Sequence, residues 1–217
     1  MGVIPVFETM RVEEGRVRLS ARHLARLAAS GAPPARVAEA EAVIDEALLL
    51  TDQPFLLRVD VADDGVEPST RPVPPVGRVD LPLHRSYDPA DATRLVKAAD
   101  RAWAERAEAE AGGEPLLVSR DGLIGETTRA AVLLVGPDGA WHAPRLRGIL
   151  PSVTRAWAIA ETGAREDDLH LDALRDAAGL ALLTAGRGVV PVDAVEGIPL
   201  ARSPLVDDLA RRWRELP

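Results

Sequence analysis

The stretch PLLVSRDGLIGETTRAAVLLVGPDGAWHAP, residues 115–144, decides the fold class. It holds four short strand-like runs, separated at two points by Asp121-Gly122 and by Pro137-Asp138-Gly139. These residue types favour tight turns, so the stretch predicts a β-meander. Antiparallel strand patterns of this kind dominate over βαβ alternation along the chain, which predicts an α+β fold.

The N-terminal segments predict a hairpin followed by a helix. Residues 3–19 alternate around a Glu13-Glu14-Gly15 turn, which is typical of two paired strands. Ser20 is a good N-cap for the following helix, and Gly31 is a good C-terminal stop.

The next segments predict a second helix and further strands. Pro33-Pro34 begins an amphipathic helix that ends near Leu50. Residues 55–62 and 76–83 predict strands, and we expect the proline-rich segment 63–75 between them to be a loop.

Residues 84–92 predict a linker, so we place a domain boundary there, between a small domain of residues 1–88 and a larger one of residues 89–217. The remaining elements of the C-terminal part are expected from alanine-rich or amphipathic runs, turn residues and apolar runs. They are a helix at 98–111 ended by Gly112-Gly113, a helix capped by Ser152, a short helix at 171–178, strands at 180–184 and 188–192, and a last helix at 203–215.

Composition excludes several classes of protein. Cysteine is absent, so disulfides, thiol nucleophiles and thiolate metal sites are excluded. No apolar run reaches the ~18 residues of a membrane span, and no signal peptide is evident, so we expect a soluble, cytoplasmic protein. The net charge of −8 and the scattered arginines argue against nucleic-acid binding.

One residue stands out against this background. Lys97, in ATRLVKAADR, is the only lysine among 26 basic residues, and the other 25 are arginines. A lysine amine can lose its proton and act as a nucleophile, which a guanidinium cannot. Codon bias and an ordinary solvated charge are the alternative explanations. If residues 92–106 form one helix, Lys97 points away from the buried stripe of that helix. If residues 93–97 instead form the end of a strand, Lys97 lies on the same side as Leu95.

Several stretches together resemble the class IV aminotransferases, which are fold-type IV pyridoxal phosphate (PLP) enzymes. They are VFETMRV, GRVRL, RHLARLAAS, LVKAADRAWAERA, LLVSRDGLIGETTRA, APRLRGILPSVTRAW and LALLTAGRGVVPV, in the order and spacing of that family. The resemblance implies a two-domain fold like that of D-amino-acid aminotransferase. It also implies a C-terminal pseudo-barrel domain, with PLP bound at the domain interface.

The resemblance assigns roles by position. Lys97 would form a Schiff base with PLP, and Glu126 would pair with the pyridine nitrogen, which suits the chemistry of both residue types. Arg26 would bind the cofactor phosphate together with Val153 and Thr154 at a helix start. Without the resemblance, Glu126 is a solvated carboxylate, Arg26 a surface charge, and Ser152 a plain helix cap.

Departures from the family pattern are also present. Members usually have a further strand before the Phe7-Glu8-Thr9 element, so we expect an N-terminal truncation and a missing or rebuilt part of the substrate pocket. Ala131 replaces the usual Asn after the glutamate motif. Ala185 stands where a Ser or Thr commonly contacts phosphate, with Thr184 beside it. The isolated histidines form no metal-ligand spacing, and we interpret them as structural; they are His23, His84, His142 and His170.

Within this family, the chain most resembles aminodeoxychorismate lyase. Three segments carry this resemblance: LARLAAS, RLRGILPSVTRAW and RGVVPV. That resemblance implies conversion of 4-amino-4-deoxychorismate to 4-aminobenzoate and pyruvate in a folate-type pathway. A branched-chain or D-amino-acid aminotransferase is the alternative, and a degenerate, non-catalytic homologue is the second alternative. A small-molecule amino substrate and a homodimer are expected in either catalytic case.

Overall fold

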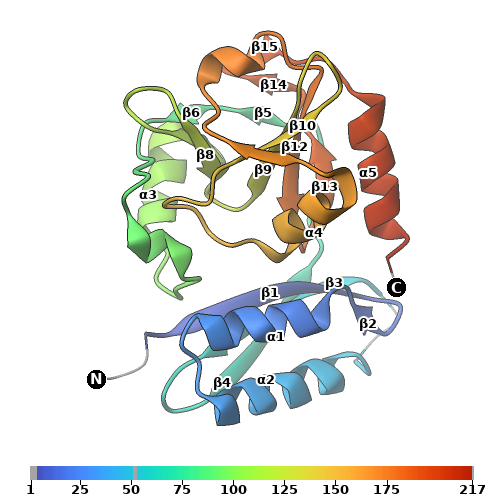
Figure 1. Cartoon of the computed structure of the whole chain (residues 1–217). Coiled ribbons are helices and arrows are strands. Elements are labelled where there is room, and N and C mark those ends of the chain that lie inside the picture. Colours follow the sequence, from blue (N-terminus) through green and yellow to red (C-terminus); the bar gives the residue numbers. More distant parts are fainter. Residues whose placement is uncertain (1–3, 51–52, 217) are drawn as a thin grey trace.

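The computed structural model describes residues 4–50 and 53–216. A four-stranded sheet of order β2-β1-β3-β4 forms the lower layer with two helices, and three further sheets of five, three and three strands lie above it with the other helices (Figure 1). The lower layer consists of β1 (Val6–Glu13), β2 (Arg16–Val17), α1 (Ser20–Ala29), α2 (Pro34–Ala47), β3 (Phe55–Val61) and β4 (Val66–Pro72).

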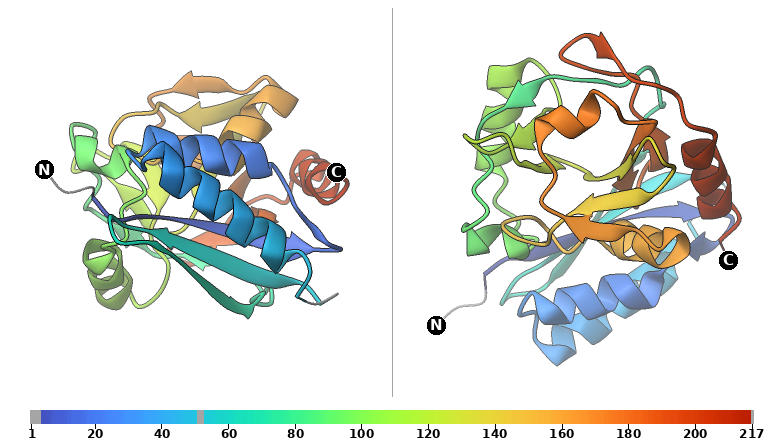
Figure 2. Two further views of the ribbon diagram at one scale, coloured as in Figure 1. Left: turned by 90° about the horizontal axis from the view of Figure 1, so that it is seen from below. Right: turned by 45° about the horizontal axis from the view of Figure 1, so that its top comes forward.

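Alternation along β1 and β3 gives the lower sheet two different faces. Met10 on β1 and Leu57 on β3 are fully buried in the core beneath α1 and α2, which cover that face (Figure 2). Burying one such side chain stabilises the fold by roughly 1.5–3 kcal/mol. The intervening residues Phe7, Thr9 and Arg58 point to the opposite face, toward the rest of the molecule.

The predicted hairpin and first helix are confirmed, with one correction. Glu13 pairs with Arg16, so Glu14 and Gly15 form a two-residue turn, and both have positive φ (53° and 67°), as a type I′ turn requires. Ser20 is not the N-cap. It is the first residue of α1, and Leu19 precedes the helix in a left-handed conformation without a side-chain cap. The part of the hairpin prediction that falls on Val3 lies outside the described residues.

The prediction of a loop over residues 63–75 is wrong, because Val66–Pro72 forms β4. This strand pairs antiparallel with β3 over its whole length, from Val61↔Val66 to Phe55↔Pro72. Its two prolines are tolerated because β4 lies at the edge of the sheet, where one side of the strand has no ladder partner. Helix α2 also ends earlier than expected, at Ala47.

The upper part of the molecule holds the remaining elements. These are β5 (Asp80–Leu81), β6 (Leu83–His84), η1 (Ala92–Leu95), α3 (Ala102–Ala111), β7 (Leu116–Val118), β8 (Ile124–Thr127), β9 (Ala131–Val135), β10 (Trp141–Pro144), α4 (Val153–Thr162), β11 (Arg165–Asp167), η2 (Leu171–Leu174), β12 (Gly179–Thr184), β13 (Gly188–Pro191), β14 (Ala194–Val195), β15 (Ile198–Pro199) and α5 (Pro204–Arg214). The strands expected at 115–144, 180–184 and 188–192 and the last helix are therefore confirmed.

The expected meander is split between two sheets. Strands β7 and β8 pair in a sheet of order β6-β7-β8, whereas β9 and β10 belong to a five-stranded sheet of order β11-β10-β9-β12-β13. Both faces of β9 and β12 are buried, against two separate clusters. Leu133 contributes to one cluster and Leu134 to the other, which explains the continuous apolar run.

Three other predictions need smaller corrections. The strand expected at 76–83 is reduced to the two-residue strands β5 and β6, and the helix expected at 98–111 begins only at Ala102. The helix expected at 171–178 is a single 3₁₀ turn, Leu171–Leu174. Short strands such as these are defined by partners distant in sequence, since β5 pairs with β14 and β6 with β7.

The predicted linker is packed tightly. The Tyr87 hydroxyl donates to the backbone carbonyl of Arg147 (2.6 Å), and a Cβ at Gly125 would lie 2.9 Å from the Tyr87 ring. Gly148 has a φ of 55°, and a Cβ there would come within 2.1 Å of the Asp88 carbonyl oxygen. Glycine is therefore required at 148. The division of the chain at residues 88–89 stays a prediction.

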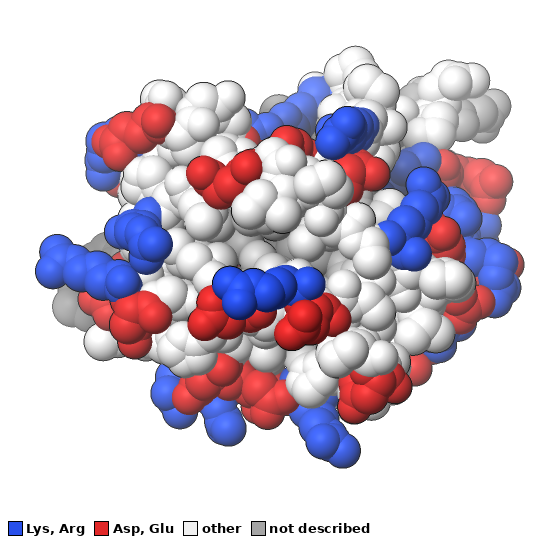
Figure 3. All heavy atoms as spheres, turned by 90° about the horizontal axis from the view of Figure 1, so that it is seen from above, with Lys and Arg blue, Asp and Glu red and all other residues white. Residues whose placement is uncertain are grey.

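The upper face of the molecule carries both signs of charge intermingled (Figure 3). In the described part of the chain, no helix is long and apolar enough to cross a membrane. Within the same residues, no cluster of His, Asp or Glu could hold a metal ion.

Candidate active site

A cavity of about 970 Å³ opens between the lower sheet and the upper part of the molecule. The lower sheet contributes the side of β1, β3 and β4 that faces away from α1 and α2. All seven site residues predicted from the resemblance line this cavity, although they come from five separate segments. They are Arg26, Lys97, Glu126, Val153, Thr154, Thr184 and Ala185.

Lys97 is held at the edge of β1. It lies beyond the 3₁₀ turn η1, in extended backbone, where its carbonyl accepts a hydrogen bond from the Phe7 N–H (3.1 Å). Neither of the two conformations considered from the sequence is adopted in full, because Ala92–Leu95 forms a 3₁₀ turn and strand-like pairing is limited to the isolated bridge between Ala98 and Val6. The side chain is 15% exposed, and its Nζ lies 3.8 Å from Glu8 and 4.9 Å from the centre of the Phe7 ring.

The environment of Lys97 favours the neutral amine. Burial lowers its pKa to about 7; the Glu8 carboxylate opposes this shift, while nearby arginines, Arg26 foremost, reinforce it. Since only the unprotonated amine attacks a carbonyl carbon, a pKa near neutrality makes Lys97 suitable as a nucleophile.

Glu8 lies at the centre of a buried polar cluster that we did not predict. Arg26 donates to both carboxylate oxygens (2.6 Å each), and His23 donates through Nδ1 at 2.8 Å. Burial alone would raise the pKa of Glu8, but Lys97, His23 and Arg26 together hold it well below its usual range. This permanent anion therefore positions both the amine of Lys97 and the guanidinium of Arg26.

Arg26 also reaches the N-terminus of α4. Its second terminal nitrogen donates to the Pro151 carbonyl (3.2 Å), directly before the first turn of that helix. The predicted Ser152 cap is confirmed, because its hydroxyl accepts from the Arg155 N–H at 3.3 Å. The cap leaves the N–H groups of Val153 and Thr154, together with the helix dipole, for another acceptor.

Two further groups at this end suit an anion. Among the described residues, the buried Thr154 hydroxyl has no hydrogen-bond partner. The Thr184 hydroxyl accepts from the Arg187 N–H (3.0 Å) and retains its own proton for donation, next to Ala185. With Arg26 and α4, these groups fit the phosphate of PLP.

Glu126 occupies a different part of the cavity wall, on β8. Its side chain is buried, and burial raises its pKa to about 8. Within the described chain, only the Leu150 N–H donates to the Glu126 carboxyl (3.2 Å). This hydrogen bond lowers the pKa, and so do the charges of Arg94, Arg101 and Arg155, but burial has the larger effect. A carboxyl that titrates this close to neutrality can share a proton with a pyridine nitrogen.

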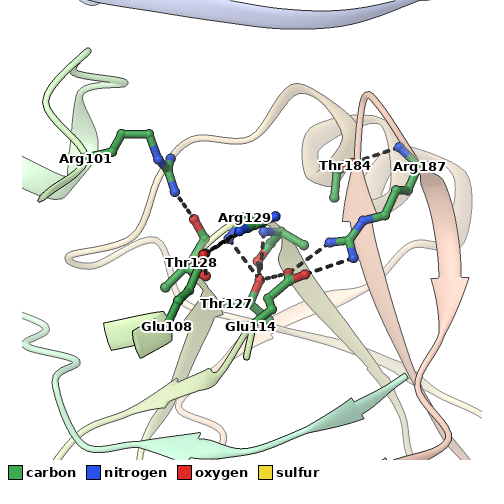
Figure 4. A network of polar contacts seen from close by, with 9 residues as sticks. Arg101, Glu108, Glu114, Thr127, Thr128, Arg129, Thr184 and Arg187 are labelled. Atoms are coloured by element: carbon green, nitrogen blue, oxygen red, sulfur yellow. Dashed lines mark hydrogen bonds and ion pairs between the residues drawn. The ribbon is translucent and has the colours of Figure 1, made fainter. Parts of the chain in front are cut away.

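A network of charged and polar residues forms part of the cavity wall (Figure 4). Glu108 accepts from the Arg129 Nε (2.8 Å) and from the Thr128 hydroxyl (2.6 Å). Glu114 binds Arg187 at 2.8 Å and so ties the β12–β13 turn to the start of β7. Arg101 approaches from the opposite side and donates to the Thr128 carbonyl.

The chain matches the family model for amino-transferase class IV over residues 5–195. It belongs to the class IV aminotransferase family. No curated protein matches it.

Solved structures share the fold. A Mesorhizobium loti protein described as a "Putative amino-acid aminotransferase" is 32% identical, with a TM-score of 0.76, over 88% of this chain and 99% of its own. A Legionella pneumophila protein described as a "Putative 4-amino-4-deoxychorismate lyase" is 20% identical, with a TM-score of 0.84, over 99% and 91%. A hypothetical aminotransferase from Mycobacterium tuberculosis, in its PLP-bound form, is 23% identical, with a TM-score of 0.79, over 98% and 88%.

Proposed function

We propose that this class IV family member is a PLP-dependent enzyme that acts on a primary amine, with Lys97 as the residue that bonds to the cofactor. The observation that carries the proposal is the placement of the chain's single lysine. Its amine lies in a cavity, 3.8 Å from the carboxylate that also binds Arg26. The PLP-bound Mycobacterium tuberculosis structure of the same fold supports the choice of cofactor.

Each residue contributes a separate task. PLP supplies an aldehyde that condenses with amines and a ring that withdraws electrons from the neighbouring carbon. Arg26, Thr154 and the N-terminus of α4 would bind its phosphate, and Glu126 would hold a proton at its ring nitrogen. Lys97, released when the substrate amine replaces it, would carry a proton to or from the substrate carbon.

Two reactions fit these tasks. The first is the lyase reaction, release of 4-aminobenzoate and pyruvate from 4-amino-4-deoxychorismate. The motif resemblance and the fold shared with the Legionella protein support it. The second is transamination of an amino acid, which the 32% identity to the Mesorhizobium protein favours. Both reactions would use the same residues, so the fold alone does not decide between them.

Absorption spectroscopy tests the cofactor proposal. The purified protein incubated with PLP should develop a band in the near-ultraviolet or visible range that Lys97→Arg lacks. That variant has a guanidinium in place of the primary amine, and a guanidinium does not form an imine with the cofactor. A wild-type protein that remains colourless would instead favour the degenerate homologue.

Product assays then separate the two reactions. The lyase releases pyruvate from 4-amino-4-deoxychorismate without an added keto acid, whereas the aminotransferase turns over only when a keto acid is supplied. A folate-type role, a cytoplasmic location and a homodimer remain predictions. Light scattering of the purified protein measures the last of these directly.

A further inference from the structure

Arg101 differs from the other arginines around the cavity. Five of them form an ion pair with an acidic residue, and each has its charge compensated within the protein. These pairs are Arg26–Glu8, Arg58–Asp60, Arg94–Asp91, Arg129–Glu108 and Arg187–Glu114. For Arg101, the described residues provide no ion pair; its guanidinium donates to the neutral carbonyl of Thr128 (Figure 4).

Arg71 is the remaining cavity arginine, and its situation is different. It lies on the edge strand β4 and is exposed, so water solvates its charge. Arg101 is partly buried, and burial lowers its pKa, with Glu108 opposing the shift. A partly desolvated cation without an ion-pair partner is destabilising, unless an anion arrives from outside the protein.

The position of Arg101 relates it to the reacting amine. The centre of its guanidinium lies 5.9 Å from the centre of the Phe7 ring, the same ring that Lys97 approaches at 4.9 Å. It also lines the same cavity as Glu126, whose pKa it helps to lower against the larger effect of burial. A molecule that reaches Lys97 therefore passes within the range of Arg101.

We infer that Arg101 binds a carboxylate of the substrate, so that the enzyme selects amino acids over amines without an acid group. This inference rests on the proposed function. Among the described residues, one N–H group of the guanidinium donates to Thr128, and the other four leave enough for a two-point contact with a carboxylate.

The test compares substrate pairs that differ only in charge. Wild type, Arg101→Gln and the matched control Arg71→Gln are loaded with PLP and titrated with each enantiomer of alanine and of alaninamide. The change in the cofactor spectrum is followed. Each variant is compared with wild type for the same compound, so the different basicities of the two amines cancel.

We expect Arg101→Gln to weaken the response to alanine at least about tenfold, because a charge-assisted hydrogen bond is lost, with a much smaller change for alaninamide. Arg71→Gln should match wild type, and Arg101→Lys should fall between the two. Calorimetric titration with benzoate and benzamide should show the same loss for the carboxylate alone. Equal losses for charged and neutral compounds, or a wild type without preference in either pair, would overturn the inference.

The outcomes also separate this inference from the proposed function. If wild type and Arg101→Gln both show the lysine-dependent band but equal selectivity, the PLP proposal stands and the role of Arg101 fails. If wild type itself shows no band, the proposed function fails and this inference fails with it. Circular dichroism of Arg101→Gln verifies that any loss arises in a folded protein.

Discussion

Two buried carboxylates, Glu126 in the cavity wall and Glu8 behind Lys97, have opposite pKa shifts. Burial raises the pKa of Glu126 to about 8, whereas Glu8 is held well below its usual range even though burial acts on it in the same direction. The difference lies in their partners. Glu8 receives Arg26, His23 and the charge of Lys97, but Glu126 receives one backbone N–H.

The comparison shows how one site can use two buried carboxyl groups in different ionisation states. A buried carboxylate surrounded by donors remains an anion and fixes the groups around it, which here are the amine and the guanidinium. A buried carboxyl with few donors keeps its proton until a basic partner arrives. The first suits a positioning role and the second a proton-sharing role toward the cofactor ring.

The largest expected effect comes from neutralising each carboxylate in turn. Glu8→Gln leaves Lys97 and Arg26 without their anion, so we expect a loss of about 3–5 kcal/mol in the free energy of unfolding. Glu126→Gln replaces a group that is mostly protonated at pH 6 by a neutral group of similar shape. This substitution should change the free energy of unfolding by less than about 1 kcal/mol. Urea denaturation at pH 6 measures both. Similar losses in the two variants would contradict the comparison.

The pH dependence of stability should differ between the two sites. Glu126 has a higher pKa in the folded state than its ordinary 4.5, so the folded state binds the extra proton and stability is lost as the pH rises from about 4.5 to 8. Between these values, wild type should lose up to about 1.4 kcal/mol per pH unit relative to Glu126→Gln. Glu8 acts oppositely, because its contribution is present above pH 4.5 and is lost as the pH falls further. A difference that does not change with pH would exclude the raised pKa of Glu126.

Titration of Lys97 tests the same comparison through the pKa of the amine beside Glu8. Its rate of modification by a small amine-reactive reagent should rise through pH 7, whereas an ordinary lysine has a pKa of 10.5. The Glu8 carboxylate raises the pKa of Lys97 against the lowering by burial, so Glu8→Gln should shift the midpoint to a lower pH. Urea-denatured protein is the control. A midpoint near 10 in the folded protein would show that the amine is not desolvated.

The smallest expected effect concerns the anion-binding end, where Glu8 holds Arg26. Thr154→Val removes a buried hydroxyl that has no partner within the described residues, so stability should stay equal or rise by up to about 1 kcal/mol. The affinity for PLP should fall about three- to tenfold, measured by fluorescence titration. Ser152→Ala, which removes the confirmed cap, should instead lose about 1 kcal/mol of stability. A large loss of stability in Thr154→Val would mean that its hydroxyl has a structural role.

The sequence predicts the elements whose signals are local. The type I′ turn at Glu14-Gly15, the α4 cap at Ser152 and the buried run of β9 all follow from neighbouring residues. Strand β4 could not be predicted, because its proline content resembles a loop and its pairing with β3 depends on an edge position set by tertiary structure. The conformation at Lys97 likewise depends on the Phe7 backbone, which is remote in sequence.

The candidate site divides in the same way. The structure places on one cavity all seven residues that the resemblance named, but the resemblance did not assign roles to Glu8, His23 or Arg101. Alternation along β1 could have placed Glu8 on the helix side, where an unpaired carboxylate would be costly, so a partner on α1 was in principle predictable. Arg101 gives no such local signal, since its lack of an acidic partner is visible only in three dimensions.

Reduction with borohydride, followed by peptide mapping, tests the central claim most directly. The PLP-loaded protein is reduced, digested with trypsin, which cleaves after Arg94 and Arg101, and analysed by mass spectrometry. The account predicts a cofactor adduct on the peptide of residues 95–101, located at Lys97. An adduct found only at the N-terminal amine, or no adduct at all, would contradict it.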